Sequence, residues 1–190
     1  MTLDEKKYRY LNRLDEPYKK RILGRYNASE LGSIIRKYKV AKHHFEPDYI
    51  QNSDRFPNQV DTVLTGMFIE DGYNKLFKKD CKCGENQSKY EYKINEEITI
   101  VVKPDFEWEK EVWEMKCPVE PVNEIPLKWK YQLEMEHRAT GKDVYLFVVM
   151  VGNGKLIEKL IPYIPSEETF NEIKTNIIKY HELIKKYQKK

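Results

Sequence analysis

Two strand-like runs decide the fold, and they read Lys103-Pro104-Asp105-Phe106-Glu107-Trp108 and Glu111-Val112-Trp113-Glu114-Met115-Lys116-Cys117-Pro118. The first run carries Asp105, and the second carries Glu114 and Lys116 two positions apart. Residues i and i+2 of a strand point to the same face, so Glu114 and Lys116 are expected to face the same way. If the two runs pair as a hairpin, two carboxylates and one ammonium crowd a single spot. That crowding is costly unless something binds there, and a divalent ion such as Mg²⁺ is the expected occupant.

The composition sets the class of protein. A chain of 190 residues is most simply one domain with a real core. The net charge of +3 allows a nucleic-acid partner without arguing for one. The sequence has no apolar run of transmembrane length, no signal peptide and an odd number of cysteines, which predicts a cytoplasmic protein without a membrane partner.

The hydrophobic period changes along the chain. Apolar residues at helical spacing predict helices over 29–38, 59–78 and 127–140 and from Ser166 onward, and residues 4–23 are helix-prone but interrupted at Pro17. Alternating or continuous apolar runs predict strands over 90–94, 98–103, 111–117, 143–151 and 155–163, with loops or turns over 41–58 and 81–86. The order α, β, β, β, α, β, with a further strand and helix, indicates an α/β (α+β) fold with a central mixed sheet flanked by helices.

These residues, in this order, resemble the PD-(D/E)xK nuclease superfamily, which has the restriction-endonuclease-like fold. Pro104-Asp105 is similar to its PD element, and Glu114-Met115-Lys116 to its (D/E)xK element. Gly66-Met67-Phe68-Ile69-Glu70 resembles the GxxxE element of the branch that includes lambda exonuclease, YqaJ-type recombinases and RecB-like nucleases, and Tyr131-Gln132-Leu133-Glu134 resembles its glutamine helix. The resemblance divides a single domain, 1–190, into a helical extension (1–58), a nuclease core (59–151) and a C-terminal strand and helix (152–190).

The resemblance implies a DNA nuclease that uses Mg²⁺ or Mn²⁺ to hydrolyse phosphodiester bonds, expected to be an exonuclease in recombination, repair or viral replication. A homo-oligomer is compatible with it. Asp105 and Glu114 are the expected metal ligands, with the Met115 carbonyl as a third ligand and Glu70 completing the site directly or through water. Lys116 would orient the attacking water or stabilise the charge on the phosphate. Gln132 would hydrogen-bond to the attacking water, to a metal ligand or to the DNA backbone.

Several other residues are candidates for DNA contact. Arg55, beside Phe56, could hold a terminal phosphate. A basic group lies around Arg36. The helix over 127–140 carries further candidates, which are Lys128, Lys130, Tyr131 and Arg138. The competing interpretation is a solvated charged face for the cations and core packing for Tyr131.

The cysteines and two histidines give weaker signals. Cys81, Cys83 and Cys117 cannot supply the four thiolates of an iron–sulfur cluster from one chain, so no such cluster is expected. Cys81 and Cys83 could form half of a zinc site, but a turn ending in glycine is the favoured interpretation. His43 and His44 are adjacent, and adjacent residues rarely hold one ion together.

Three other functions compete with an exonuclease. The chain could be an endonuclease, a module on a nuclease fold that binds nucleic acid without cutting, or a structural protein that uses its basic, tyrosine-rich helices as an interface. The complete set of Asp105, Glu114 and Lys116 favours a nuclease over a non-cutting module.

Overall fold

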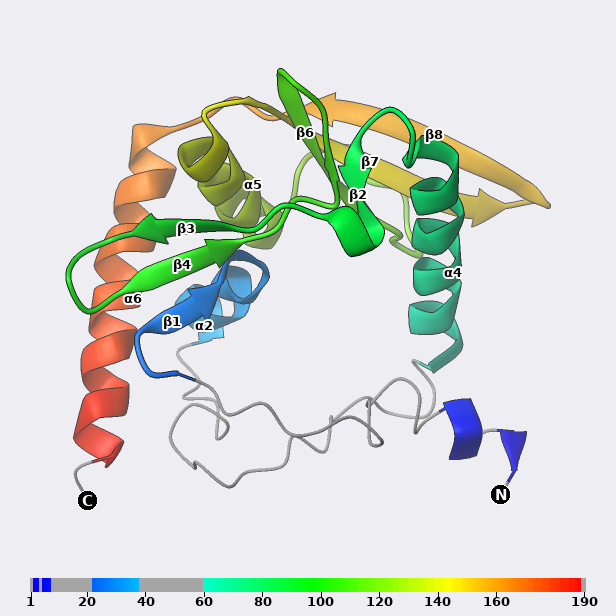
Figure 1. The fold of residues 1–190 in the computed structure, drawn as a ribbon. Helices are drawn as coiled ribbons and strands as arrows, with labels where there is room; N and C mark the ends of the chain where they lie inside the picture. Colours follow the sequence, from blue (N-terminus) through cyan, green and yellow to red (C-terminus); the bar gives the residue numbers. More distant parts are fainter. Residues whose placement is uncertain (1, 4, 8–21, 38–59, 189–190) are drawn as a thin grey trace.

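The computed structural model describes residues 2–3, 5–7, 22–37 and 60–188 (Figure 1). Some expectations fall outside these residues: most of the helix-prone segment 4–23, the loop over 41–58 with His43, His44 and Arg55, and the side chain of Arg36. Within the described residues, no helix is both long enough and apolar enough to cross a bilayer.

The described elements follow the predicted order. The α-helices are α2 (Leu31–Lys37), α4 (Val60–Phe77), α5 (Leu127–Thr140) and α6 (Glu167–Gln188), with short 3₁₀ helices at Ala28–Glu30 and Gly84–Asn86. The strands are β1 (Arg25–Asn27), β2 (Lys82–Cys83), β3 (Tyr90–Lys93), β4 (Thr99–Val102), β5 (Phe106–Glu107), β6 (Glu111–Lys116), β7 (Asp143–Gly152) and β8 (Lys155–Pro162). The predicted helices and strands of the nuclease core are confirmed, and β5 lies within the first strand-like run, whereas β1 and β2 were not predicted.

The strands form two sheets rather than the one central sheet that was expected. The larger sheet has the order β2-β5-β6-β7-β8, and the smaller has the order β1-β4-β3. The strand predicted over 98–103 belongs to the smaller sheet, where β4 pairs with β3 and β1. The chain leaves the smaller sheet at Lys103 and Pro104, where proline has no N–H to continue a ladder. The hairpin partner of β6 is therefore the two-residue strand β5, with Phe106 opposite Trp113.

Helices cover both faces of the larger sheet. Strands β6 and β7 are parallel and are joined through α5, as a parallel connection requires. On one face Met115 and Phe147 pack with Tyr73 of α4. On the other face Val112 and Leu146 pack with Leu133 of α5. Because side chains alternate along β6, Glu114 shares the α5 face with Val112.

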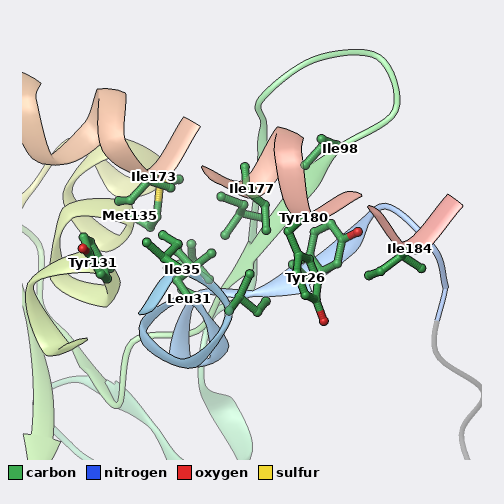
Figure 2. Packing of buried hydrophobic residues seen from close by; sticks show 14 residues of the cluster. Tyr26, Leu31, Ile35, Ile98, Tyr131, Met135, Ile173, Ile177, Tyr180 and Ile184 are labelled. Atoms are coloured by element: carbon green, nitrogen blue, oxygen red, sulfur yellow. The ribbon is translucent and has the colours of Figure 1, made fainter. Parts of the chain in front are cut away.

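A second core joins the smaller sheet to α2, α5 and α6 (Figure 2). Helix α6 lays an apolar stripe along it at helical spacing, formed by Ile173, Ile177, Tyr180 and Ile184. Tyr131 enters the same core from α5. Helix α5 is thus enclosed between the two sheets, which explains why every residue from 131 to 136 is buried.

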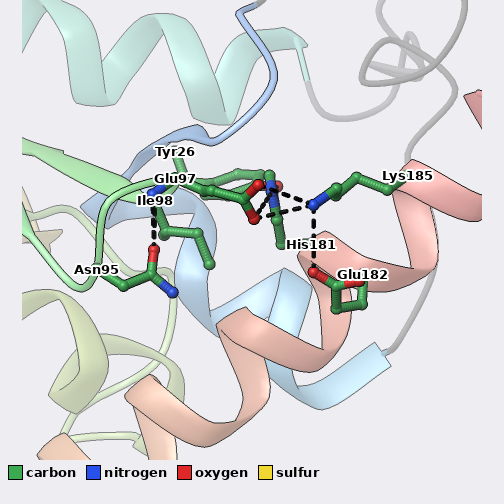
Figure 3. Close-up of polar contacts among 7 residues, drawn as sticks. All are labelled: Tyr26, Asn95, Glu97, Ile98, His181, Glu182 and Lys185. Atoms are coloured by element: carbon green, nitrogen blue, oxygen red, sulfur yellow. Dashed lines mark hydrogen bonds and ion pairs between the residues drawn. The ribbon is translucent and has the colours of Figure 1, made fainter.

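Polar contacts fasten the turn between β3 and β4 to α6 (Figure 3). Lys185 Nζ donates to both carboxylate oxygens of Glu97 at 2.9 Å. His181 Nδ1 lies 2.9 Å from the hydroxyl of Tyr26 in β1. Gly24 comes close to the same turn with φ +82°, and a Cβ there would lie 2.1 Å from the Glu97 carbonyl oxygen, so only glycine fits.

Candidate active site

The β5–β6 hairpin fixes Asp105 beside the second run. Asp105 precedes β5, and its Oδ2 accepts a hydrogen bond from the backbone N–H of Met115 at 2.8 Å. Gln87 Nε2 donates to the Pro104 carbonyl at 2.6 Å, which holds the incoming chain. The expected proximity of Asp105 to the Glu114–Lys116 segment is therefore present in the structure.

Glu114 and Lys116 project together from β6. The Lys116 ammonium forms an ion pair with Glu114, whose side chain is almost fully buried. The other carboxylate oxygen of Glu114 has no hydrogen-bond partner among the described residues. One cation therefore satisfies only part of the negative charge at this point.

The electrostatics of the site reflect that imbalance. Burial raises the pKa of Asp105 well above its ordinary value, and the charge of Glu114 raises it further. Burial alone would lower the pKa of Lys116, but the nearby Glu114 and Asp105 carboxylates outweigh it and raise that pKa. Lys116 is consequently held as an ammonium, and an additional cation would be favourable beside the acids.

Helix α4 brings Glu70 toward the same acids. A Cβ at Gly66 would lie 3.5 Å from the Cβ of Cys117, so this turn of α4 passes close to the end of β6. Glu70 is one helical turn further on, on the same side. Its pKa is raised by burial and then by the charge of Glu114. Burial and the charge of Glu70 also raise the pKa of the Cys117 thiol to about 11.

Helix α5 contributes one predicted residue and one that sequence reasoning missed. Gln132 is 7% exposed. Glu136, one turn later, is fully buried, and its pKa is raised well above the ordinary value by burial and then by Glu114. The i, i+4 spacing from Gln132 was the available signal for Glu136.

The donors suit a hard divalent cation. Mg²⁺ prefers carboxylate, carbonyl and water oxygens, and Asp105, Glu114 and Glu70 supply carboxylates around one spot.

Within the described part of the chain, Glu97, His181 and Glu182 are the one group of three with ligand atoms all within 4.8 Å of one another. There the Lys185 ammonium already lies 2.9 Å from Glu97 and 3.6 Å from Glu182. The acids around Asp105 are more widely spread, so a cation would have to draw them together.

The residues expected to contact DNA differ in whether their side chains are held by contacts inside the protein or remain accessible. Tyr131 is fully buried and donates its hydroxyl to Glu172 at 2.7 Å, so it packs in the core and offers no surface to DNA. Arg138 Nε donates to Glu134 at 2.8 Å, and its guanidinium stacks 4.5 Å from the Phe170 ring centroid. Those contacts give Arg138 a structural role.

Two of these residues remain accessible at the start of α5. Lys128 is exposed, with its Nζ 5.2 Å from the Trp129 ring centroid, and Lys130 is half-buried. They lie on the helix that carries Gln132, which keeps them as candidates for phosphate contact.

Comparison with known proteins supports the fold. No protein-family model matches the sequence, and no curated protein matches it. A solved structure of a protein named SSO0001 has a TM-score of 0.64 at 15% identity, covering 96% of this chain and 87% of that one. The structure of the alkaline exonuclease LHK-Exo from Laribacter hongkongensis has a TM-score of 0.52 at 12% identity, covering 88% of this chain and 93% of that one. The chain therefore has the predicted mixed α+β, restriction-endonuclease-like fold.

Proposed function

We propose that this chain is a divalent-metal-dependent DNA nuclease that hydrolyses phosphodiester bonds and acts as an exonuclease. The observation that carries the proposal is the hydrogen bond from the Met115 N–H to Asp105, which holds a carboxylate beside Glu114 and Lys116. A purely structural ion pair between Glu114 and Lys116 would not need a second, partly buried acid at the same point. The fold shared with an alkaline exonuclease supports the same activity.

The site residues divide the chemistry among them. Asp105 and Glu114 would hold Mg²⁺ or Mn²⁺, with Glu70 and the Met115 carbonyl as further ligands. When bound, the ion supplies charge neutralisation at the phosphate and acidifies a water molecule. Lys116, which stays protonated, donates hydrogen bonds to the attacking water or to the developing negative charge on the phosphate. Gln132 orients the water or the DNA backbone from α5.

Lys128 and Lys130 are the described cations that we assign to the DNA phosphates. The roles of Arg36 and Arg55 in DNA binding, assembly as a homo-oligomer, and service in recombination, repair or viral replication remain predictions from the family resemblance.

A cleavage assay tests the proposal. End-labelled linear DNA and closed circular DNA, each single- and double-stranded, are incubated with Mg²⁺, with Mn²⁺ or with EDTA. The proteins are the wild type, a Glu114→Ala/Lys116→Ala variant, and Lys179→Ala as a matched control at an exposed position of α6. We expect metal-dependent cutting of linear DNA by the wild type and the control alone.

Each other result has a definite meaning. Cutting of closed circles would replace the exonuclease by an endonuclease. Binding of DNA without cutting in either metal would overturn the nuclease and favour a binding module.

A further inference from the structure

Glu136 is an anomaly in the interior of the protein. Its side chain is fully buried, and neither carboxylate oxygen accepts a hydrogen bond from a donor among the described residues; the side chain within hydrogen-bonding reach is another carboxylate, that of Glu114. Buried polar groups are almost always hydrogen-bonded, and a carboxylate without a partner is among the most costly groups to bury. A carboxylate kept in this state needs a reason.

The same helix shows that this fold can supply hydrogen bonds to a buried carboxylate. Glu134 is equally buried, yet it accepts hydrogen bonds from Arg138 Nε at 2.8 Å, the Tyr163 hydroxyl at 2.7 Å and the Ser166 N–H at 2.9 Å. Glu136 has no corresponding arrangement in the described structure. The difference lies in what each side chain meets, because Glu134 contacts Ser166 at the start of α6 whereas Glu136 lies within hydrogen-bonding reach of Glu114 in β6.

The surroundings of Glu136 carry excess negative charge. Glu114 lies within hydrogen-bonding reach of Glu136 and has the largest charge effect on it, and the charge of Asp105 acts in the same direction. Lys116 is the cation among them, and it is already paired with Glu114. One oxygen of Glu114 also lacks a partner in the described structure, so unsatisfied carboxylate oxygens from α5 and β6 gather in the same place.

We propose that Glu136 is a further metal-holding carboxylate of the Asp105–Glu114 site, binding the divalent cation directly or through one of its water molecules. This inference rests on the proposed nuclease function. Hard divalent cations take several oxygen ligands and leave room for water, which is what two unsatisfied carboxylates on facing elements provide. The buried acid is then compensated in the metal-bound protein and uncompensated in its absence.

Binding and stability measurements test the proposal without relying on activity. Mn²⁺ affinity is measured by electron paramagnetic resonance of the free ion and by calorimetry, for the wild type and for Glu136→Gln. We expect binding to Glu136→Gln to be weaker by about 10- to 100-fold. In EDTA the same variant should melt at least about 2 °C higher, because a neutral amide of the same shape replaces an uncompensated acid.

Glu134→Gln is the matched control on the same helix. It should melt lower than the wild type because it disturbs a satisfied acid, while Mn²⁺ affinity stays unchanged. If Glu136→Gln binds Mn²⁺ like the wild type, the inference is overturned and the nuclease proposal is untouched. A lower melting temperature of Glu136→Gln in EDTA would overturn it as well, by showing a structural role. If the wild type itself binds no Mn²⁺, the metal-dependent function fails and the inference fails with it.

Discussion

Asp105 Oδ2 and the backbone N–H of Met115 lie 2.8 Å apart, joined by a hydrogen bond across the open end of the β5–β6 hairpin. The contact ties the position of a candidate metal ligand to the register of a strand pair rather than to a loop. Glu114 and Lys116 are placed by the pleat of the same strand. The backbones of three candidate residues are thus fixed before any cation binds, so that only their side chains would have to close around it.

Replacement of Asp105 by asparagine separates metal binding from folding. The amide oxygen can still accept the Met115 N–H, so we expect the fold to persist. The melting temperature in EDTA should be equal or higher, because burial and Glu114 disfavour a charge at this position. Metal-dependent cleavage should fall by at least about 100-fold, because loss of even an outer partner of a metal site costs about 10- to 100-fold. Glu109→Gln, an exposed acid in the turn of the same hairpin, is the control and should cleave normally. Normal cleavage by Asp105→Asn would remove Asp105 from the site.

The parts of the site that were predictable from sequence depend on short-range rules. Strand alternation placed Glu114 and Lys116 on one face, and the expected pairing of the two runs as a hairpin placed Asp105 near them. The two-sheet arrangement was not predictable in this way, because β4 is a short apolar run, Thr-Ile-Val-Val, that could belong to either sheet. Glu136 was missed because a glutamate on a helix normally faces solvent. Only the enclosure of α5 between the two sheets buries it, and that enclosure depends on long-range packing.

Gly24 and Gly72 allow a paired test of the backbone. Gly24→Ala forces a Cβ to within 2.1 Å of the Glu97 carbonyl oxygen at φ +82°. We expect a loss of at least about 1–3 kcal/mol in the free energy of unfolding. Gly72→Ala adds a methyl group in α4 with no atom within 4 Å, and should be neutral or stabilising by about 0.5–1 kcal/mol. Urea denaturation measures both, and equal stability of the two variants would contradict this account of the turn between β3 and β4.

Glu107 gives the protein a defined sensitivity to acid. Burial alone would raise the pKa of Glu107, but Lys142, Ser88 and Tyr90 outweigh it and lower the pKa to about 2 from an ordinary 4.5. The Lys142 ammonium lies 2.6 Å from the carboxylate. Because the folded-state pKa is the lower one, this stabilisation is complete above pH 4.5 and is lost as the pH falls toward 2. We expect it to amount to about 1–3 kcal/mol.

Urea denaturation between about pH 7 and about pH 3 measures that loss. Lys142→Met should unfold more easily at neutral pH and lose less further stability in acid than the wild type does. Lys75→Met breaks an exposed ion pair with Asp71, and should leave both quantities nearly unchanged. If Lys142→Met loses as much stability in acid as the wild type, Glu107 is not the group responsible.

Lys128 and Lys130 can be tested as phosphate contacts through the salt dependence of DNA binding. Each lysine that neutralises a phosphate releases a counterion, so the slope of log affinity against log salt concentration reports how many phosphates are neutralised. Changing both residues to glutamine should make that slope shallower by nearly 2, because each phosphate neutralised on duplex DNA adds about 0.9 to it. Fluorescence anisotropy in EDTA measures binding without cleavage. Lys174→Gln/Lys179→Gln removes the same charge from exposed positions of α6. This control weakens the long-range attraction between protein and DNA as much as the first double variant does, but it should leave the slope unchanged. Equal slopes in the two double variants would mean that DNA does not follow the start of α5, and would assign the phosphates to other cations of the chain.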